Sequence, residues 1–102
     1  MLEDEPAICS INLGEVLYAL TRSPGGSVAS ELVDGVRQVV RVVDADWPLV
    51  KAAARIKAAG RLSYADAFCL ATGEALAAPV ATGDPEMLRY EGSIELIDLR
   101  AQ

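Results

Sequence analysis

Apolar residues along the chain fall into two kinds of pattern. Short runs rich in β-branched residues predict strands at residues 7–11, 38–43, 79–82 and 94–99. Between these runs, apolar positions recur at the spacing of an amphipathic helix, which predicts helices over about residues 12–22, 28–37, 47–59 and 63–77. Strands that alternate with helices are typical of an α/β domain with a mostly parallel sheet flanked by helices. We therefore expect one domain over residues 1–102, with ligands bound beyond the carboxyl ends of its strands.

The ends of several elements are marked by residues with strong local preferences. Residues 23–26 read Ser-Pro-Gly-Gly and predict a loop. Asp46 is suited to cap a helix that holds Pro48 in its first turn, and Gly60 would end that helix. Ser63 would then cap the next helix.

The helical periodicity also assigns side chains to the core. The first two predicted helices would turn their apolar faces inward, and these faces comprise Leu13, Val16, Leu17, Leu20, Val28, Leu32 and Val36. Trp47 and Tyr18 are assigned to core or dimer packing, although both could stack on bases. Cys9 and Cys69 lack CxxC spacing and are interpreted as small buried residues of a reducing compartment.

Composition and charge narrow the possible chemistry. Apolar residues make up 52% of the chain, and the formal net charge is −6 with no histidine. This balance argues against a passive nucleic-acid binder, whose affinity comes mainly from Lys and Arg. The absence of histidine excludes Ser-His-Asp and Cys-His catalysis and His-ligated zinc. Because the first residues are acidic and no apolar run approaches a membrane span, we expect a soluble cytoplasmic protein without a secretory signal.

Three acidic residues lie near predicted helix starts, namely Glu15, Asp66 and Asp84. Glu15 and Asp84 both follow predicted strands, so they would emerge at the same edge of a parallel sheet, and Asp66 could join them there. Carboxylates without His or Cys select hard cations such as Mg²⁺ or Mn²⁺. Such ions can generate a hydroxide nucleophile and hold a phosphodiester for displacement. The pattern is compatible with a metal-dependent nuclease.

Helix capping is the simpler explanation of each of these acids. Residues 12–15 and 63–66 read Asn-x-x-Glu and Ser-x-x-Asp, which is the spacing of a capping box or a near variant. Asp84 before Pro85 has the form of an N-cap followed by proline at the first helical position. Taken singly, each acid fits capping better than catalysis.

Three segments in order resemble the PIN-domain family. They are residues 10–18 (SINLGEVLY), 62–67 (LSYADA) and 82–86 (TGDPE), and the resemblance extends over about residues 7–99. Within the family, the chain is most similar to the VapC-type toxins of prokaryotic toxin–antitoxin pairs. The resemblance implies a PIN-like three-layer α/β fold and an Mg²⁺- or Mn²⁺-dependent endoribonuclease. Such proteins are usually homodimers that a protein antitoxin holds inactive.

The resemblance also implies roles for individual residues. Glu15, Asp66 and Asp84 would be the catalytic, metal-binding acids. Neighbouring polar groups would orient carboxylates or water, and these are Ser10, Asn12 and Thr82. Glu86 could reach the same metal, although a solvated first-turn position is its simpler interpretation. Arg61 is the candidate for contact with RNA phosphates, against the simpler interpretation that it belongs to a solvated surface.

The chain departs from the family pattern at its start. Family members begin with a central strand that carries a further acid in an Asp-Ser or Asp-Thr-Ser motif. Here Glu3 and Asp4 lie in a charged segment without an apolar strand. We therefore expect an N-terminally truncated PIN-like domain, through a misassigned start, a shortened chain or degeneration, with weak or no activity. Two alternatives stay open: a non-catalytic remnant that binds an antitoxin or itself, and an unrelated α/β domain whose acids only cap helices.

Overall fold

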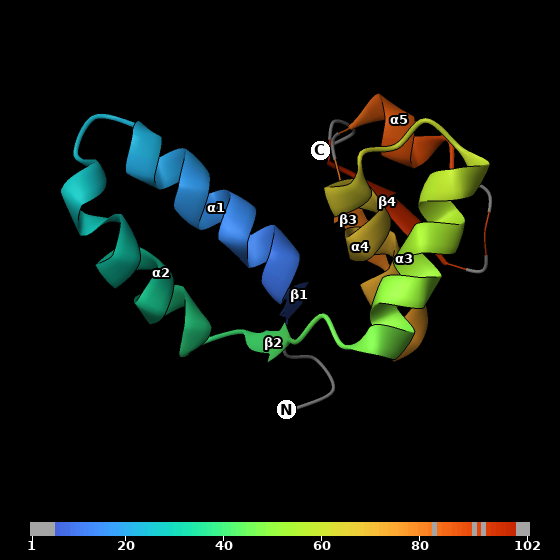
Figure 1. Ribbon diagram of the computed structural model, residues 1–102, viewed down its shortest axis with the longest axis horizontal. Helices are drawn as coiled ribbons and strands as arrows, with labels where there is room; N and C mark the ends of the chain where they lie inside the picture. Colours follow the sequence, from blue (N-terminus) through green and yellow to red (C-terminus); the bar gives the residue numbers. More distant parts are fainter. Residues whose placement is uncertain (1–5, 83, 91, 93, 100–102) are drawn as a thin grey trace. The chain divides into compact units, whose positions relative to one another are not determined.

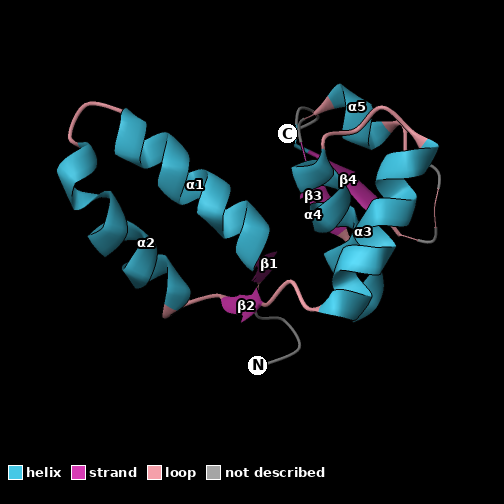
Figure 2. Cartoon of the chain, in the orientation of Figure 1, coloured by secondary structure: helices cyan, strands magenta, loops and turns pink. Residues whose placement is uncertain are grey.

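The computed structural model describes residues 6–82, 84–90, 92 and 94–99, so Glu3 and Asp4 lie outside the described residues. The chain divides into two compact units, Met1–Ala45 and Asp46–Gln102, called here the first and the second unit (Figure 1). Each unit combines helices with one pair of short parallel strands (Figure 2). The prediction of an α/β fold with parallel strands is confirmed. Along the described residues, no helix combines the length and the apolar character needed to cross a membrane.

The first unit is a single crossover between two parallel strands. Strand β1 (Ala7–Cys9) pairs with β2 (Arg41–Val43), and Ile8 lies opposite Val42. The chain between them forms α1 (Ser10–Arg22), the 3₁₀ turn η2 (Gly26–Val28) and α2 (Ala29–Arg37). Parallel strands need such a long connection, because a tight turn can only join antiparallel strands.

Helix α1 begins two residues earlier than predicted, at Ser10. Cys9 occupies the N-cap position without a side-chain cap hydrogen bond, so Asn12 is inside the helix and the capping box predicted for residues 12–15 is wrong. The hydroxyl of Ser10 accepts a hydrogen bond from the backbone N–H of Ala45 at 3.2 Å. This contact joins the start of α1 to the segment that follows β2.

The predicted inward face of α2 is also wrong. Val28 and Leu32 are 46% and 55% exposed, whereas Ala29 and Val33 are buried. A Cβ at Gly26 would meet the backbone of Thr21, so the chain passes very close to the end of α1 at this turn. The stripe that faces inward therefore begins with the small Ala29. In α1 itself, Leu13 is buried as predicted, but Val16 is exposed.

The second unit packs two helices against a strand pair. Its elements are α3 (Trp47–Ala59), α4 (Tyr64–Leu76), β3 (Val80–Thr82), α5 (Pro85–Leu88) and β4 (Leu96–Asp98). Strands β3 and β4 are parallel, with Ala81 opposite Ile97. Helices α3 and α4 contact each other along their lengths (Figure 1).

The helix ends of the second unit agree with the sequence. Asp46 caps α3 by accepting a hydrogen bond from the N–H of Leu49 at 3.0 Å, and Gly60 is the C-cap of α3. Ser63 caps α4 through the N–H of Asp66, also at 3.0 Å. These caps satisfy backbone N–H groups that have no partner within the helix.

Small side chains fill the contact between α3 and α4. Ala53 and Ala67 are fully buried, as is the larger Leu70 on α4. Alanine at such positions lets two helix backbones approach closely while the leucine fills the remaining space. Trp47 and Tyr18 are 70% and 61% exposed. Their assignment to core packing is therefore wrong, and dimer packing stays a prediction. Cys9 is buried and Cys69 is half-buried.

Candidate metal centre

Glu15 lies in the second turn of α1, where its side chain is exposed. Since the helix has no acid in its first turn and no side-chain cap, helix capping no longer explains Glu15. The carboxylate borders an open hollow of about 850 Å³ on the surface of the first unit, beside Ile11, Val16 and Tyr18. Among the described residues it makes no ion pair. An acid in apolar surroundings without a counter-charge is available to bind a cation.

Asn12 lies three residues before Glu15 on α1 and borders the same hollow. Residues three apart are neighbours on a helix surface. The Oδ1 atom of Asn12 is buried. The structure therefore places the predicted amide neighbour beside Glu15, within the first unit.

Asp66 stands in the first turn of α4 and is half-buried. Its backbone N–H donates to the hydroxyl of Ser63, which fixes the start of the helix around it. The position favours a carboxylate, because unpaired N–H groups give a helix start a partial positive charge worth about 0.3–1 kcal/mol to an anion. The prediction that Ser63 caps α4 is confirmed. This cap involves the backbone N–H of Asp66 and does not assign a role to the carboxylate of Asp66.

Asp84 is held at the end of β3 by a short chain of hydrogen bonds. Its backbone N–H donates to the hydroxyl of Thr82 at 3.0 Å, and that buried hydroxyl in turn lies 3.5 Å from the sulfur of Met87. Its Oδ1 atom accepts from the N–H of Glu86 at 2.9 Å, so Asp84 is the N-cap of α5, with Pro85 directly after it. The hydroxyl of Thr82 thus holds the backbone of Asp84.

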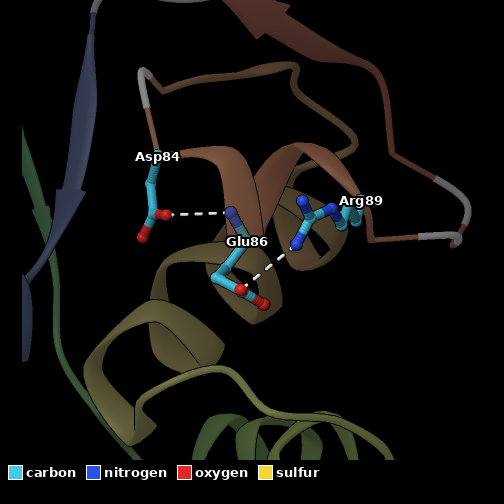
Figure 3. A network of polar contacts seen from close by, with 3 residues as sticks. All are labelled: Asp84, Glu86 and Arg89. Atoms are coloured by element: carbon cyan, nitrogen blue, oxygen red, sulfur yellow. Dashed lines mark hydrogen bonds and ion pairs between the residues drawn. The ribbon is translucent and has the colours of Figure 1, made fainter.

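One oxygen of Asp84 stays outside this network. Figure 3 shows the capping oxygen directed at the N–H of Glu86 and the second oxygen turned away from it. Within the described part of the chain, the Asp84 carboxylate makes no ion pair. Capping therefore occupies half of this carboxylate and leaves the other half for a ligand.

Glu86 is directed elsewhere. Its carboxylate pairs with the guanidinium of Arg89 at 3.2 Å, one turn further along the chain (Figure 3). Both side chains are largely exposed, at 51% and 73%. In this arrangement Glu86 is a solvated partner of Arg89, which agrees with its simpler interpretation.

The structure distributes the predicted residues between the two units. Glu15, Asn12 and Ser10 belong to the first unit, and Asp66, Thr82 and Asp84 belong to the second. Within either unit taken by itself, the described residues contain no group of three or more acidic or cysteine side chains placed to hold a metal ion. The donors themselves suit a hard divalent cation, because they are carboxylate oxygens and because Mg²⁺ commonly uses only one or two carboxylates together with water.

Two further residues of the second unit were not singled out from the sequence. Tyr90 donates a hydrogen bond from its hydroxyl to Glu74 at 2.7 Å, and partial burial together with this bond and the charge of Glu74 raises the pKa of Tyr90 to about 12. Arg89 pairs with Glu86. The spacing of Glu86 and Arg89 is a signal for an ion pair on a helix, but the helix there is only one turn long.

A family model described as PIN domain matches residues 1–93. No curated protein matches the chain.

Proposed function

Because the chain belongs to the PIN-domain family, we propose that it is a metal-dependent endoribonuclease of the VapC type, which hydrolyses RNA phosphodiesters. PIN domains are generally nucleases, and they typically use divalent metal ions. The acids of this chain and the absence of histidine agree with Mg²⁺ or Mn²⁺ as that ion.

One observation carries the proposal, namely the half-occupied carboxylate of Asp84. The buried hydroxyl of Thr82 fixes the backbone of Asp84, and the N–H of Glu86 takes one carboxylate oxygen. The remaining oxygen has a fixed position and no counter-charge among the described residues. A ligand held in advance binds a metal with a smaller loss of conformational freedom.

The other acids are proposed as partners of Asp84 in holding the metal. Asp66 is half-buried at the start of α4, and Glu15 is an exposed carboxylate in apolar surroundings on α1. Side-chain capping does not explain the position of Glu15. When bound, the divalent ion would supply positive charge to the phosphate and lower the pKa of an attacking water. Asn12 and Thr82 would keep the acids in place.

The toxin–antitoxin role is part of the same proposal. It is supported by the three sequence segments that resemble VapC-type toxins and by apolar side chains that the first unit leaves uncovered. Leu32 and Val39 are 55% and 67% exposed in this unit. Such side chains are suited to contact with a second copy of the chain or with a protein antitoxin.

The direct test replaces Asp84 by Asn. Asparagine keeps an oxygen that can cap α5 and removes the charge that a metal needs. We expect Asp84→Asn to lose RNA cleavage by about a hundredfold or more, because the loss of a group that only supports a metal ligand already costs about tenfold to a hundredfold. Cleavage of a fluorescent RNA in Mn²⁺ measures this, and urea denaturation checks that the fold is retained.

The chain offers a matched control at Asp46. This residue caps α3 through the same kind of hydrogen bond, to the N–H of Leu49, and Asp46→Asn makes the same chemical change without touching the proposed site. Asp46→Asn should cleave RNA at the wild-type rate. Wild-type cleavage by Asp84→Asn would contradict the proposed function.

A further inference from the structure

The second unit contains a groove that the proposed metal site does not use. The groove has a volume of about 350 Å³ and lies between the end of α3 with its following loop and the segment of α5. Its lining includes Ile56, Arg61, Leu62, Glu86, Arg89 and Tyr90. It therefore combines two guanidinium groups, one carboxylate and an apolar wall.

The charge of this groove is opposite to that of the chain. Arg61 and Arg89 outnumber Glu86 in the lining, whereas the whole chain has a formal net charge of −6. Arg61 makes no ion pair with any of the described residues. A local excess of positive charge in an acidic protein favours an anionic ligand at this place.

The geometry of the groove suits a nucleic-acid strand. Arginine presents a planar fork of donors that matches a phosphate. Tyr90 supplies an aromatic ring, and the hydrogen bond of its hydroxyl to Glu74 at 2.7 Å holds that ring in place. Bases and sugars of single-stranded RNA pack on such rings next to a cationic path for the backbone.

The groove is also joined along the chain to the proposed acids. Helix α5 starts at the cap Asp84 and then contributes Glu86, whose own N–H is the group that Asp84 binds. On the other side, Arg61 lies two residues before Ser63, the cap of the helix that carries Asp66. Glu86 and Arg61 in the groove are therefore two and five residues along the chain from Asp84 and Asp66, which are two of the proposed metal ligands.

Glu86 already binds the guanidinium group of Arg89 that a phosphate would need. Its carboxylate lies 3.2 Å from the guanidinium of Arg89 (Figure 3), and both side chains are more than half exposed. Exposed ion pairs of this kind are weak, because water screens the charges and two long side chains must be ordered. A phosphate can therefore displace Glu86, but the displacement lowers the affinity.

We propose that this groove binds a phosphate of single-stranded RNA through Arg61 and Arg89, and that Glu86 competes with that phosphate for Arg89. The inference rests on the proposed function, because it assigns a substrate-binding subsite to the same nuclease. In this proposal the carboxylate of Glu86 takes the place of the phosphate on Arg89 and thereby lowers the affinity for RNA.

Binding can be measured apart from cleavage. The full chain is titrated into fluorescein-labelled oligouridine in Ca²⁺, and fluorescence anisotropy gives the Kd over a series of salt concentrations. Arg61→Gln and Arg89→Gln should each raise the Kd about threefold to tenfold and reduce the slope of log Kd against log salt by about 0.7. Arg55→Gln removes the same charge from an exposed position of α3 outside the groove and should leave both quantities nearly unchanged.

A second set of variants tests whether Glu86 competes with RNA for Arg89. Glu86→Gln should lower the Kd about twofold to fivefold, and it should have no effect in a chain that already carries Arg89→Gln, because the interaction it removes acts through Arg89. Glu95→Gln removes the same charge from another exposed position. Equal tightening by Glu95→Gln, or tightening by Glu86→Gln that persists without Arg89, would overturn the competition.

The outcomes separate this inference from the proposed function. Unchanged Kd values for both arginine variants, with cleavage still lost in Asp84→Asn, would overturn the groove and leave the nuclease. Weakened binding by the arginine variants, with full cleavage by Asp84→Asn, would overturn the proposed metal site and leave the groove as an RNA-binding surface. A wild-type chain that does not bind the oligouridine would overturn the inference outright.

Discussion

At the scale of single residues, Asp84 shows that capping and metal binding need not exclude each other. Its Oδ1 atom accepts from the N–H of Glu86, and its second oxygen is turned away from that group (Figure 3). Asp46 makes the same kind of cap at α3. The two aspartates differ in what holds them, because only Asp84 has its backbone fixed by a buried hydroxyl, that of Thr82. The local sequence identifies both aspartates as caps. The hydrogen bond from the backbone of Asp84 to Thr82 distinguishes Asp84 from Asp46.

A pH-dependent prediction belongs to Tyr90. Its pKa is raised from 10.0 to about 12 by partial burial, by the hydrogen bond to Glu74 and by the charge of that carboxylate. The unfolded chain loses the phenolic proton near the ordinary pKa, whereas the folded chain keeps it until the higher value. The contribution of Tyr90 to the free energy of unfolding is therefore complete below the ordinary pKa and is lost as pH rises toward the raised one.

Urea denaturation at a series of pH values across this interval tests the prediction. Tyr90→Phe removes the titrating group, so the free energy of unfolding of this variant should fall less steeply over the same interval than that of the wild type. Glu74→Gln keeps an acceptor for the phenol and removes the charge, so its slope should be intermediate. Equal slopes for wild type and Tyr90→Phe would contradict the raised pKa of Tyr90.

At the scale of elements, the sequence located the helix ends that depend on local chemistry. Asp46, Gly60 and Ser63 were predicted as ends of helices and are found there, because a cap involves only residues within one turn of each other. The start of α1 was misplaced because Ser10 contacts Ala45, which is distant in sequence. A contact of that separation leaves no mark in the local pattern around Asn12.

The prediction of which face of α2 is buried is wrong for a related reason. Periodicity gives the spacing of apolar residues but not the angle at which a helix meets its neighbour. That angle is set at η2, where Gly26 brings the chain against the end of α1. Ala29 is buried in consequence, while the larger Leu32 is 55% exposed.

Gly73 supports a prediction about the packing of α4. A Cβ at this buried glycine would lie 2.5 Å from Cδ1 of Ile94 and 2.5 Å from Cγ2 of Val80. Gly73→Ala should improve helix propensity by about 1 kcal/mol, but overpacking of the core costs about 1–3 kcal/mol. We expect a net loss of stability, since the stiff Val80 cannot easily move aside.

Gly35 in α2 is the matched control, because nothing lies within 4 Å of a Cβ placed there. Gly35→Ala should raise the free energy of unfolding by about 0.5–1 kcal/mol through backbone entropy and helix propensity alone. Urea denaturation of both variants measures the difference. An increase of similar size for Gly73→Ala would mean that α4 and β3 are less closely packed than described.

At the scale of the whole molecule, the net charge of −6 and the proposed role of the acids in binding a metal are linked. An acidic protein repels RNA unless something supplies positive charge, and a bound divalent ion can do so at the place of reaction. The sequence could find the acids, because their segments resemble those of PIN domains. It could not find the groove with Arg61 and Arg89, because residues of α3 and α5 meet there only after folding.

Metal binding gives the prediction that separates a nuclease from a non-catalytic PIN-like module. A metal that binds the folded chain stabilises it by RT ln(1 + [metal]/Kd), which is about 2.7 kcal/mol at a concentration one hundred times Kd. Mn²⁺ should therefore raise the Tm of the wild type, and EDTA should reverse the increase. Asp84→Asn should lose most of this increase, because a missing carboxylate weakens the binding of a hard cation. Asp46→Asn should retain it, since Asp46 caps α3 and is not one of the proposed metal ligands. A Tm that rises equally in all three proteins would reveal nonspecific binding to an acidic surface, and a Tm that does not rise in any of them would favour the non-catalytic module.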